Sequence, residues 1–371
     1  MRSFVHAMLR EIYEQPEAIR RTLEMYVEGS DLKAEAWSPL TAWSSPEGEV
    51  LIAASGSSRH CGLAGEVTLE DLCGLAVDVE YASEYSCRGS EETRHPSVIV
   101  ISQSGETSDT LAALREAQSR GQRTLAITNV PTSSMAREAT VSLPLGAGKE
   151  FAIPATKSFT CQLVVLYLVA LYEAKRLGTL DASAIAKRIA ELDALPALLD
   201  SELPSWETQL AELAHKHRGA STFLFLGRGV HYPIAREGAL KLKEASYVHA
   251  EGYPSGELKH GPNALVSDRV PVVILATVDR TLEASRLRYE KTLQLLVDLQ
   301  TQGATVIALA NAGDEDIARL VTDCVYVQPL SEHLFPVAEV VPLQLFSYFM
   351  ALEHGVDVDR PRNLAKAVIE A

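Results

Sequence analysis

Short apolar segments alternate with helical segments along most of the chain. In the first half, strands are predicted at residues 50–54, 77–81, 97–102 and 124–128, with helices at 59–73 and 108–120. The strand segments are mostly apolar throughout, which is typical of strands buried on both faces. The pattern predicts an α/β fold in which a parallel sheet is flanked by helices.

The second half of the chain repeats this plan. Residues 222–226 and 271–276 form comparable apolar strands, and the segment at 303–311 resembles the one at 121–129. Matching segments lie about 170–180 residues apart, and a constant offset of this kind indicates an internal repeat. We therefore expect a duplicated domain, although two unrelated α/β domains would share the same rhythm.

Further segments flank or join the predicted repeats. A helix is expected at residues 6–26, broken or kinked at Pro16, and a loop rich in Ser, Pro and Gly follows at 28–48. A helical, acidic connector at 180–215 joins the two halves. The longest apolar stretch, 163–172, is too short to cross a bilayer, so it predicts a buried helix and no membrane anchor.

Composition and charge narrow the classes of function. Of the 371 residues, 47% are hydrophobic and 22% are charged, which excludes wholesale disorder. The net charge is −15 and the pI is near 5.2, so neither nucleic acid nor an anionic membrane is an expected partner. The five cysteines form no CxxC pair and the N-terminus has no secretory signal. We expect a reduced, cytoplasmic protein without a disulfide framework or a metal site.

A turn rich in hydroxyl groups follows one of the predicted strands. The sequence SQSGET at 102–107 ends that strand and opens a helix, whose N-terminus offers unpaired N–H groups and a partial positive charge. The candidate phosphate ligands are Ser102, Gln103, Ser104 and Thr107, with Ser57 and Ser58 after another strand. A helix cap needs a single hydroxyl, so the cluster favours a phosphate site. The matching segment at 276–280 has no glycine and few hydroxyls, so we expect phosphate binding in the first half alone.

Three charged residues share one face of a predicted helix. Glu237, Lys241 and Glu244 have the spacing i, i+4 and i+7, which places them within about 60° of one another around the helix. This spacing suits ion pairs on a solvated surface, and it also suits groups that handle protons. Proton transfer between adjacent carbons needs one carboxylate within reach of both, together with an acid for the carbonyl oxygen.

Several motifs together produce a specific resemblance. They are SGSS at 55–58, SQSGET at 102–107, EGALKLKE at 237–244, ELKHGP at 257–262 and PRNLAK at 361–366. In this order they resemble the sugar isomerase (SIS) domains of glucosamine-6-phosphate synthases, beginning from HAMLREIYEQP at 6–16. The resemblance implies two tandem SIS domains and a catalytic C-terminal tail. The expected parts are an N-terminal helix and loop (1–45), SIS domain 1 with the phosphosugar site (46–195), SIS domain 2 (196–352) and the tail (353–371).

The resemblance also implies roles for individual residues. Glu244 corresponds to the residue that moves a proton between C1 and C2 of the sugar, and Glu237 and Lys241 match supporting positions. His260 corresponds to the histidine that opens the sugar ring. The family supplies it from the neighbouring subunit, which implies a homodimer. Lys366 corresponds to the lysine that forms a Schiff base with the ketose carbonyl. The alternatives are a loop-anchoring histidine and an ordinary lysine on a frayed tail.

Two of the chain's departures from the synthase pattern bear on its function. IPATK at 153–157 replaces VASTK, so the hydroxyl at Ala155 is missing, and a contact among the sugar-binding candidates Ile153, Ala155 and Thr156 is lost or changed. Nothing in the chain resembles the N-terminal glutaminase domain of the synthases.

Two enzyme interpretations follow, together with one that involves no catalysis. In the first, which we place ahead of the others, the protein interconverts glucosamine 6-phosphate and fructose 6-phosphate with free ammonia, as SIS-type deaminases do. In the second, it is the isomerase subunit of a glutamine–fructose-6-phosphate aminotransferase and needs a separate glutaminase. The third is a sugar-phosphate sensor, which the combination of Glu244, His260 and Lys366 disfavours. The sugar phosphate is the expected ligand, and no cofactor is expected.

Overall fold

The computed structural model describes residues 3–44, 48–88 and 96–366. Contacts divide the chain into two units, each described by itself below. The first-sheet unit comprises Glu14–Glu150, Lys157–Pro196 and Ala365–Ala371, and the second-sheet unit comprises Met1–Tyr13, Phe151–Thr156 and Ala197–Leu364. The bounds of the four segments expected from the sequence stay predictions.

The first-sheet unit contains a five-stranded parallel sheet. Its strands are β3 (Glu49–Ala54), β4 (Ala76–Tyr81), β5 (Ser97–Ser102), β6 (Thr124–Thr128) and β7 (Val141–Pro144). Across the sheet their order is β4-β3-β5-β6-β7, and every neighbouring pair is parallel. The order reverses between β3 and β5. Ligands of such sheets bind outside the carboxyl ends of the strands at this switch point.

Helices cover both faces of this sheet. They are α4 (Gly56–Cys73), α5 (Ala82–Cys87), α6 (Ser108–Ser119), α7 (Ser134–Glu138) and α8 (Lys157–Leu177). Gly62 of α4 approaches one face closely, since a Cβ added there would lie 2.9 Å from Ile52. The neighbouring Leu51 points to the opposite face, where it shares a core with Val100 and with Leu114 of α6. Both faces are therefore buried, as the apolar strand segments predicted.

The second-sheet unit repeats this topology. Its strands are β8 (Thr222–Gly227), β9 (His249–Pro254), β10 (Val272–Leu275), β11 (Val306–Asn311) and β12 (Asp323–Val327). Their order is β12-β11-β10-β8-β9, again all parallel, and its reversal falls between β8 and β10. Strand for strand this is the order of the first sheet. The predicted α/β fold with two such domains is confirmed.

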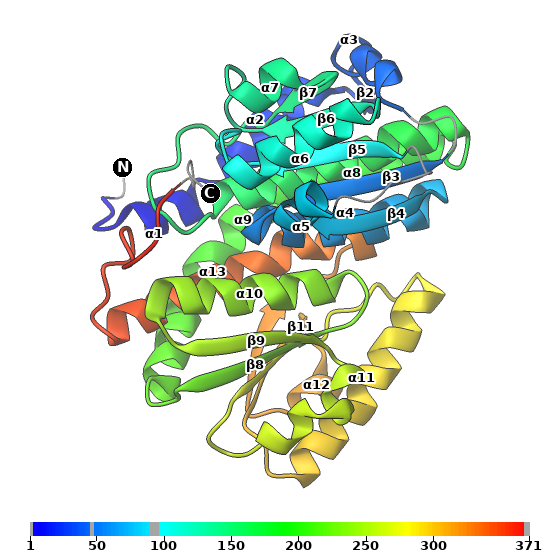
Figure 1. Cartoon of the computed structure of the whole chain (residues 1–371). Helices are drawn as coiled ribbons and strands as arrows, with labels where there is room; N and C mark the ends of the chain where they lie inside the picture. Colours follow the sequence, from blue (N-terminus) through cyan, green and yellow to red (C-terminus); the bar gives the residue numbers. More distant parts are fainter. Residues whose placement is uncertain (1–2, 45–47, 89–95, 367–371) are drawn as a thin grey trace. The chain divides into compact units, whose positions relative to one another are not determined.

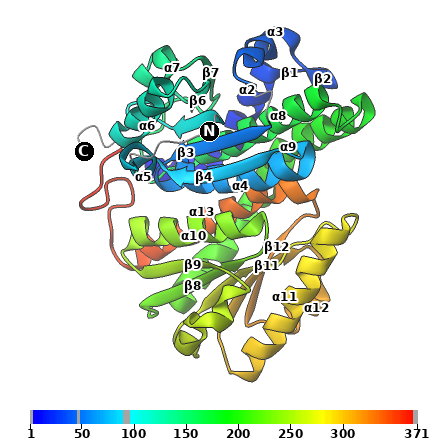
Figure 2. The same cartoon turned by 45° about the vertical axis from the view of Figure 1, so that its right-hand side comes forward.

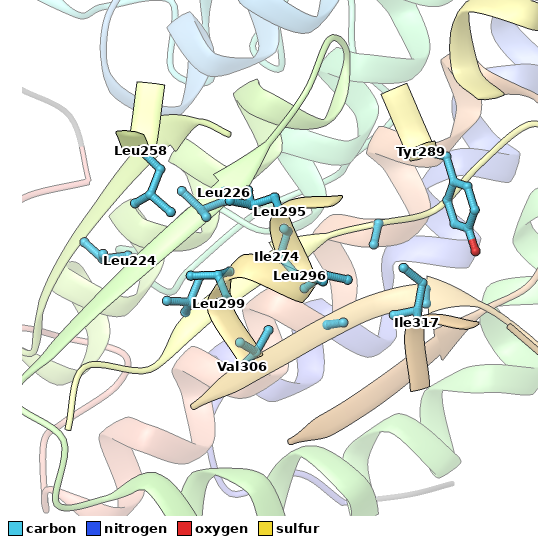
Figure 3. Close-up of a cluster of buried hydrophobic side chains, with 14 of the residues drawn as sticks. Leu224, Leu226, Leu258, Ile274, Tyr289, Leu295, Leu296, Leu299, Val306 and Ile317 are labelled. Atoms are coloured by element: carbon cyan, nitrogen blue, oxygen red, sulfur yellow. The ribbon is translucent and has the colours of Figure 1, made fainter. Parts of the chain in front are cut away.

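Helices α10 (His231–Ser246) and α13 (Phe335–Glu353) lie on one side of this second sheet, and α11 (Glu283–Thr301) and α12 (Glu315–Ala318) lie on the other (Figures 1 and 2). Figure 3 shows the core beneath α11, in which Leu224 and Ile274 of the sheet pack against Leu296 and Leu299. On the α13 side, the ring of Phe223 lies 5.7 Å from that of Phe346. Alternate residues of β8 thus point to opposite faces of the sheet.

The N-terminal segment is partly as expected. The helix broken at Pro16 appears as α1 (Ala7–Tyr13) and α2 (Gln15–Tyr26). The prediction of a loop at 28–48 is wrong for the part of this segment that the structure describes. That part contains β1 (Val27–Glu28), β2 (Asp31–Leu32), α3 (Ala34–Trp37) and the 3-10 helix η1 (Ser38–Ala42). Two buried indoles explain the order, because Trp37 donates to the carbonyl of Tyr26 at 2.9 Å and Trp43 to that of Val98 at 3.2 Å. Residues 45–47 lie outside the described residues.

The connector and the most apolar helices also match expectation. The connector forms one helix, α9 (Ala182–His217). Two segments, Lys157–Leu177 and Glu332–Glu353, have the length and hydropathy of membrane spans, but 94% of each such window is buried within the protein. Burial to this degree identifies them as core helices, as predicted for the stretch at 163–172.

Candidate active site

The hydroxyl-rich turn after β5 folds into a small cluster. The hydroxyl of Ser102 lies 2.9 Å from that of Thr107 and 3.4 Å from that of Ser104, and it accepts the N–H of Gly105 at 3.1 Å. The hydroxyl of Ser104 accepts the N–H of Glu106, also at 3.1 Å. Thr107 directly precedes the 12-residue helix α6. Three hydroxyls therefore meet at a helix N-terminus, where the helix dipole stabilises an anion.

Gly105 is required by the conformation and the packing of this turn. Its φ is +67°, and a Cβ there would lie 2.1 Å from Oγ of Ser133 and 2.8 Å from Oγ1 of Thr128. The carboxylate of Glu106 is directed to the start of α7, where it accepts the N–H of Ser134 at 2.8 Å. The acidic residue of the turn thus already serves as a hydrogen-bond acceptor for another helix.

The turn after β3 lies beside the turn after β5 at the same edge of the sheet, because β3 and β5 are parallel neighbours. Ser57 and Ser58 lie in the first turn of α4, and the hydroxyl of Ser58 accepts a hydrogen bond from Nε2 of Gln162 at 3.1 Å. Gln103 contributes its carbonyl, which accepts the N–H of Asn129 at 3.1 Å. The structure therefore places both predicted turns at the switch point of the first sheet.

The charged row of α10 is buried. Glu237 is 0% and Lys241 is 1% exposed. Nζ of Lys241 donates to Oε2 of Glu244 and lies 3.5 Å from Oε1 of Glu237. The side chain of Glu244 is 22% exposed. The shared face is confirmed, whereas the interpretation of these residues as a solvated surface row is wrong.

Because Glu237 and Lys241 are more deeply buried than Glu244, the three groups differ in their ability to exchange protons. An ammonium group inside a protein must be paired with charge or hydrogen-bond acceptors, and Lys241 is held by two carboxylates. Glu237 and Lys241 are fixed by the packing of α10. Glu244 lies at the more open end of the row, where a carboxylate can take up and return a proton.

His260 lies at the end of the 3-10 helix η2 (Glu257–His260) and is exposed. The backbone turns sharply after it, because Gly261 has a φ of +140°, a value that side chains rarely permit. His260 is thus presented on a tight loop of the second-sheet unit. Its role in ring opening stays a prediction.

The predicted sugar-binding residues Ile153, Ala155 and Thr156 also belong to the second-sheet unit. The N–H of Ile153 donates to the carbonyl of Asp359 at 3.1 Å, Thr156 is buried and Ala155 is half-buried. The carboxylate of Asp359 caps α1 by accepting two of its N–H groups at 2.8 Å. Asp359 therefore ties the tail to this segment, while the contacts with sugar stay predictions.

Lys366 lies in the first-sheet unit and is anchored. Its Nζ donates to Oε2 of Glu150 at 2.6 Å. The side chain of Glu150 is 0% exposed and that of Lys366 is 26% exposed. The alternative of a frayed terminal lysine is therefore wrong for this residue, although residues 354–366 form no helix or strand.

The corresponding region of the second sheet is occupied by acidic side chains of the protein itself. Glu339 of α13 accepts a hydrogen bond from Thr277, which follows β10, at 2.5 Å, and it pairs with Nδ1 of His231 at 3.0 Å. Glu332 accepts the hydroxyl of Ser285, in the first turn of α11. Both carboxylates are at least 99% buried. They occupy the sites where an external anion would meet these donors.

His231 lies between the two carboxylates. Its Nε2 is 3.7 Å from Glu332, which also pairs with Arg288 at 2.5 Å. Burial alone would lower the pKa of His231, but the charges of Glu339 and Glu332 and the hydrogen bond to Glu339 outweigh it and raise that pKa. His231 is thus buried between two carboxylates that favour its protonated form.

No sequence motif marked Glu150, Glu339 or Asp359. Glu150 contacts a residue 216 positions away along the chain, and Glu339 contacts residues 62 and 108 positions away. Asp359 contacts residues more than 350 positions away. Glu150 follows the basic Lys149 and precedes Phe151, seven residues before the buried helix α8, so its neighbours in the sequence give no signal of its partners.

The SIS domain family matches this chain twice, at residues 45–172 and 218–354. Glutamine–fructose-6-phosphate aminotransferases from Gloeobacter violaceus and Clostridium tetani are 42% and 40% identical to it, over 99% and 98% of the chain. The chain spans only 59% of the length of each relative.

Solved structures agree with this assignment. The C-terminal domain of glucosamine-fructose-6-phosphate aminotransferase from Francisella tularensis superposes with a TM-score of 0.87 at 35% identity, covering 97% of this chain and 99% of that one. A glucosamine-6-phosphate deaminase from Thermotoga maritima covers 98% and 99% with a TM-score of 0.72, but at 24% identity it shows a shared fold alone. The chain belongs to the SIS domain family and carries two SIS domains in tandem.

Proposed function

We propose that the chain is the isomerase half of a glutamine–fructose-6-phosphate aminotransferase, a phosphosugar isomerase that acts on fructose 6-phosphate. The buried row of Glu237, Lys241 and Glu244 carries this proposal, because it presents one carboxylate at the open end of an otherwise closed ion pair. Relatives with 40–42% identity bear that name. The free-ammonia deaminase, placed first from the sequence, has weaker support, since its structural counterpart shares the fold alone.

The proposed chemistry divides among the groups described above. The hydroxyl cluster of Ser102, Ser104 and Thr107 binds the phosphate. Lys366 adds to the ketose carbonyl at C2, and ammonia from a glutaminase then replaces the lysine nitrogen. Glu244 removes a proton from C1 and returns it to C2, which converts the C2 imine into an amine and the C1 hydroxyl into an aldehyde. Each step uses a side chain with a matching position in the family motifs.

Incubation of the chain with fructose 6-phosphate tests this function. With ammonium at pH 8, glucosamine 6-phosphate should form, and solvent deuterium should enter the sugar at C1 or C2. With glutamine in place of ammonium, the chain alone should form no product, because the described residues include no recognised glutaminase site. Net release of ammonia as the strongly favoured reaction would support the deaminase interpretation. Absence of deuterium exchange with either sugar would contradict both.

We also propose a homodimer in which His260 acts in the site of the neighbouring subunit. Its exposure on a tight loop supports this assignment. Mixing inactive Glu244→Gln and His260→Asn chains should restore about a quarter of the wild-type activity, because half of the dimers are mixed and each has one intact site. Failure of mixed dimers to regain activity would place His260 in its own subunit's site. The free thiols of all five cysteines support a cytoplasmic location.

A further inference from the structure

Glu150 is a fully buried carboxylate that accepts hydrogen bonds from the first turn of α8. The side chain is 0% exposed. Its Oε1 accepts the N–H of Ser158 at 3.1 Å, and its Oε2 accepts the hydroxyl of Ser158 at 2.7 Å and Nζ of Lys366 at 2.6 Å. Ser158 lies in the first turn of α8, where the helix dipole favours negative charge. The carboxylate is therefore fixed on one side and faces the lysine on the other.

The charged groups around Glu150 have separate assignments. Lys157 donates to Glu14 at 2.6 Å and to the carbonyl of Lys149 at 2.7 Å. Arg21 donates to the carbonyl of Gly146 at 3.0 Å. The thiol of Cys161 lies within the field of Lys157, Arg21 and Glu150, and burial raises its pKa to about 12, so it stays neutral.

We propose that Glu150 is the proton acceptor and counter-ion of Lys366 during imine formation, an inference that rests on the proposed function. Glu150 removes one proton from the ammonium of Lys366. The free amine then forms a bond to C2 while the carbonyl π electrons move to oxygen. Two protons from the nitrogen end on that oxygen, one of them returned through Glu150, and the oxygen leaves as water. The balance is R–NH₃⁺ plus C=O giving R–NH⁺=C plus H₂O.

The geometry suits both ends of this step. At the start, the contact of 2.6 Å allows direct proton transfer without rearrangement of either side chain. At the end, the imine nitrogen carries one positive charge, and the ionised Glu150 remains beside it in a buried site, where such a charge needs a partner. The hydrogen bonds from Ser158 hold the carboxylate in place throughout.

Reductive trapping separates this role from a structural one. Fructose 6-phosphate and cyanoborohydride are added to the full chain, and the label on the C-terminal peptide is quantified by mass spectrometry over time. Glu150→Gln should trap sugar at least about 10²-fold more slowly than wild type at pH 7. The deficit should narrow near pH 10, where amines lose protons to solvent unaided. Glu14→Gln, which removes the carboxylate from the neighbouring buried Lys157, should trap sugar at the wild-type rate.

The outcomes are distinguishable. If wild type acquires no label on Lys366, the proposed imine itself is wrong. If wild type is labelled and Glu150→Gln is labelled equally fast, or shows a deficit that is constant with pH, the proton-acceptor role is wrong and the proposed function stands. If circular dichroism shows that Glu150→Gln does not fold, Glu150→Asp is tested in its place. That variant keeps the base, so slower labelling with a wild-type pH profile supports the proposal, and a deficit that narrows near pH 10 contradicts it.

Discussion

The two sheets share one strand order and one helix arrangement, yet their switch points differ. After β5, the hydroxyls of Ser102, Ser104 and Thr107 gather at the start of α6. After β10, the hydroxyl of Thr277 is already bonded to Glu339, and the first turn of α11 is bonded to Glu332. The first turn is arranged to accept an anion, whereas the second is neutralised by carboxylates of its own unit.

This difference shows how the same strand order and helix arrangement can support two different kinds of site. A helix N-terminus binds an anion only while its donors are not already satisfied. Resident carboxylates remove that capacity from the second copy, and the same carboxylates bind His231, the first residue of α10. The second switch point thereby positions the helix that carries Glu237, Lys241 and Glu244. Under the proposed function, phosphate binding and proton transfer belong to different copies of the fold.

The largest effect is expected at Glu244, the carboxylate proposed to transfer the proton. Glu244→Gln preserves the shape of the side chain and its contact with Lys241 but removes the base. Exchange of the C2 hydrogen with solvent should fall by about 10²- to 10⁴-fold, measured by NMR in deuterium oxide.

A matched carboxylate on the same unit serves as control. Glu315→Gln changes a residue of α12 that pairs at the surface with Arg319, and it should leave exchange unchanged. Near-normal exchange in Glu244→Gln would move the base elsewhere, first to Glu237, and α10 would then lose its assigned role.

A smaller effect is expected at the first switch point. Ser104→Ala combined with Thr107→Val removes two hydroxyls that converge on the anion site. The KM for fructose 6-phosphate should rise by the equivalent of about 1–3 kcal/mol, because each hydrogen bond to a charged group is lost. Steady-state kinetics measures this change.

The equivalent turn of the second copy provides the comparison. Thr281→Val removes an exposed hydroxyl that bonds to Asp279 within the turn after β10. It should leave KM unchanged if phosphate binds in the first copy alone. A rise in KM for Thr281→Val that matches the double variant would show that both copies contact the substrate.

The repeating frame was predictable because it depends on local patterns. Continuous apolar runs identified strands such as β5 and β6 with their observed bounds, and the glycine and hydroxyls of SQSGET identified the turn after β5. Period and spacing also placed Glu237, Lys241 and Glu244 on one helix face. The order of the strands, which creates the switch points, followed from the fold class and not from any residue.

The resident ions were not predictable, because their partners are distant in sequence. Glu339 and His231 are 108 positions apart, and Lys366 and Glu150 are 216 positions apart. The secondary structure of the segment at 28–42 was not predicted for the opposite reason, because its local sequence was misleading. Its Ser, Pro and Gly content is typical of loops, while its order depends on the burial of Trp37 against Tyr26. Tertiary packing overrode local preference there.

The smallest effect concerns the charged network that fills the second switch point. The pKa of His231 is raised above its ordinary value of 6.5, since Glu339 and Glu332 outweigh burial and the charge of Arg288. A raised pKa in the folded state means that the pairing stabilises the fold fully below pH 6.5. This contribution is lost as the pH rises through the folded-state pKa. His231→Gln should therefore cost about 1 kcal/mol more at pH 6 than at pH 9.

Urea unfolding of wild type and variant at both pH values measures this difference. His249→Gln is the matched control, because His249 also faces a carboxylate, that of Glu251 at 3.9 Å, but its side chain is 59% exposed. Solvent screens such a pair, so the control should show little dependence on pH. Equal losses for His231→Gln at pH 6 and pH 9 would mean that the pKa of His231 is not raised in the folded protein. Glu339 and Glu332 would then lack their cationic partner at this position, and the second switch point would not be neutralised by resident ions as the comparison requires.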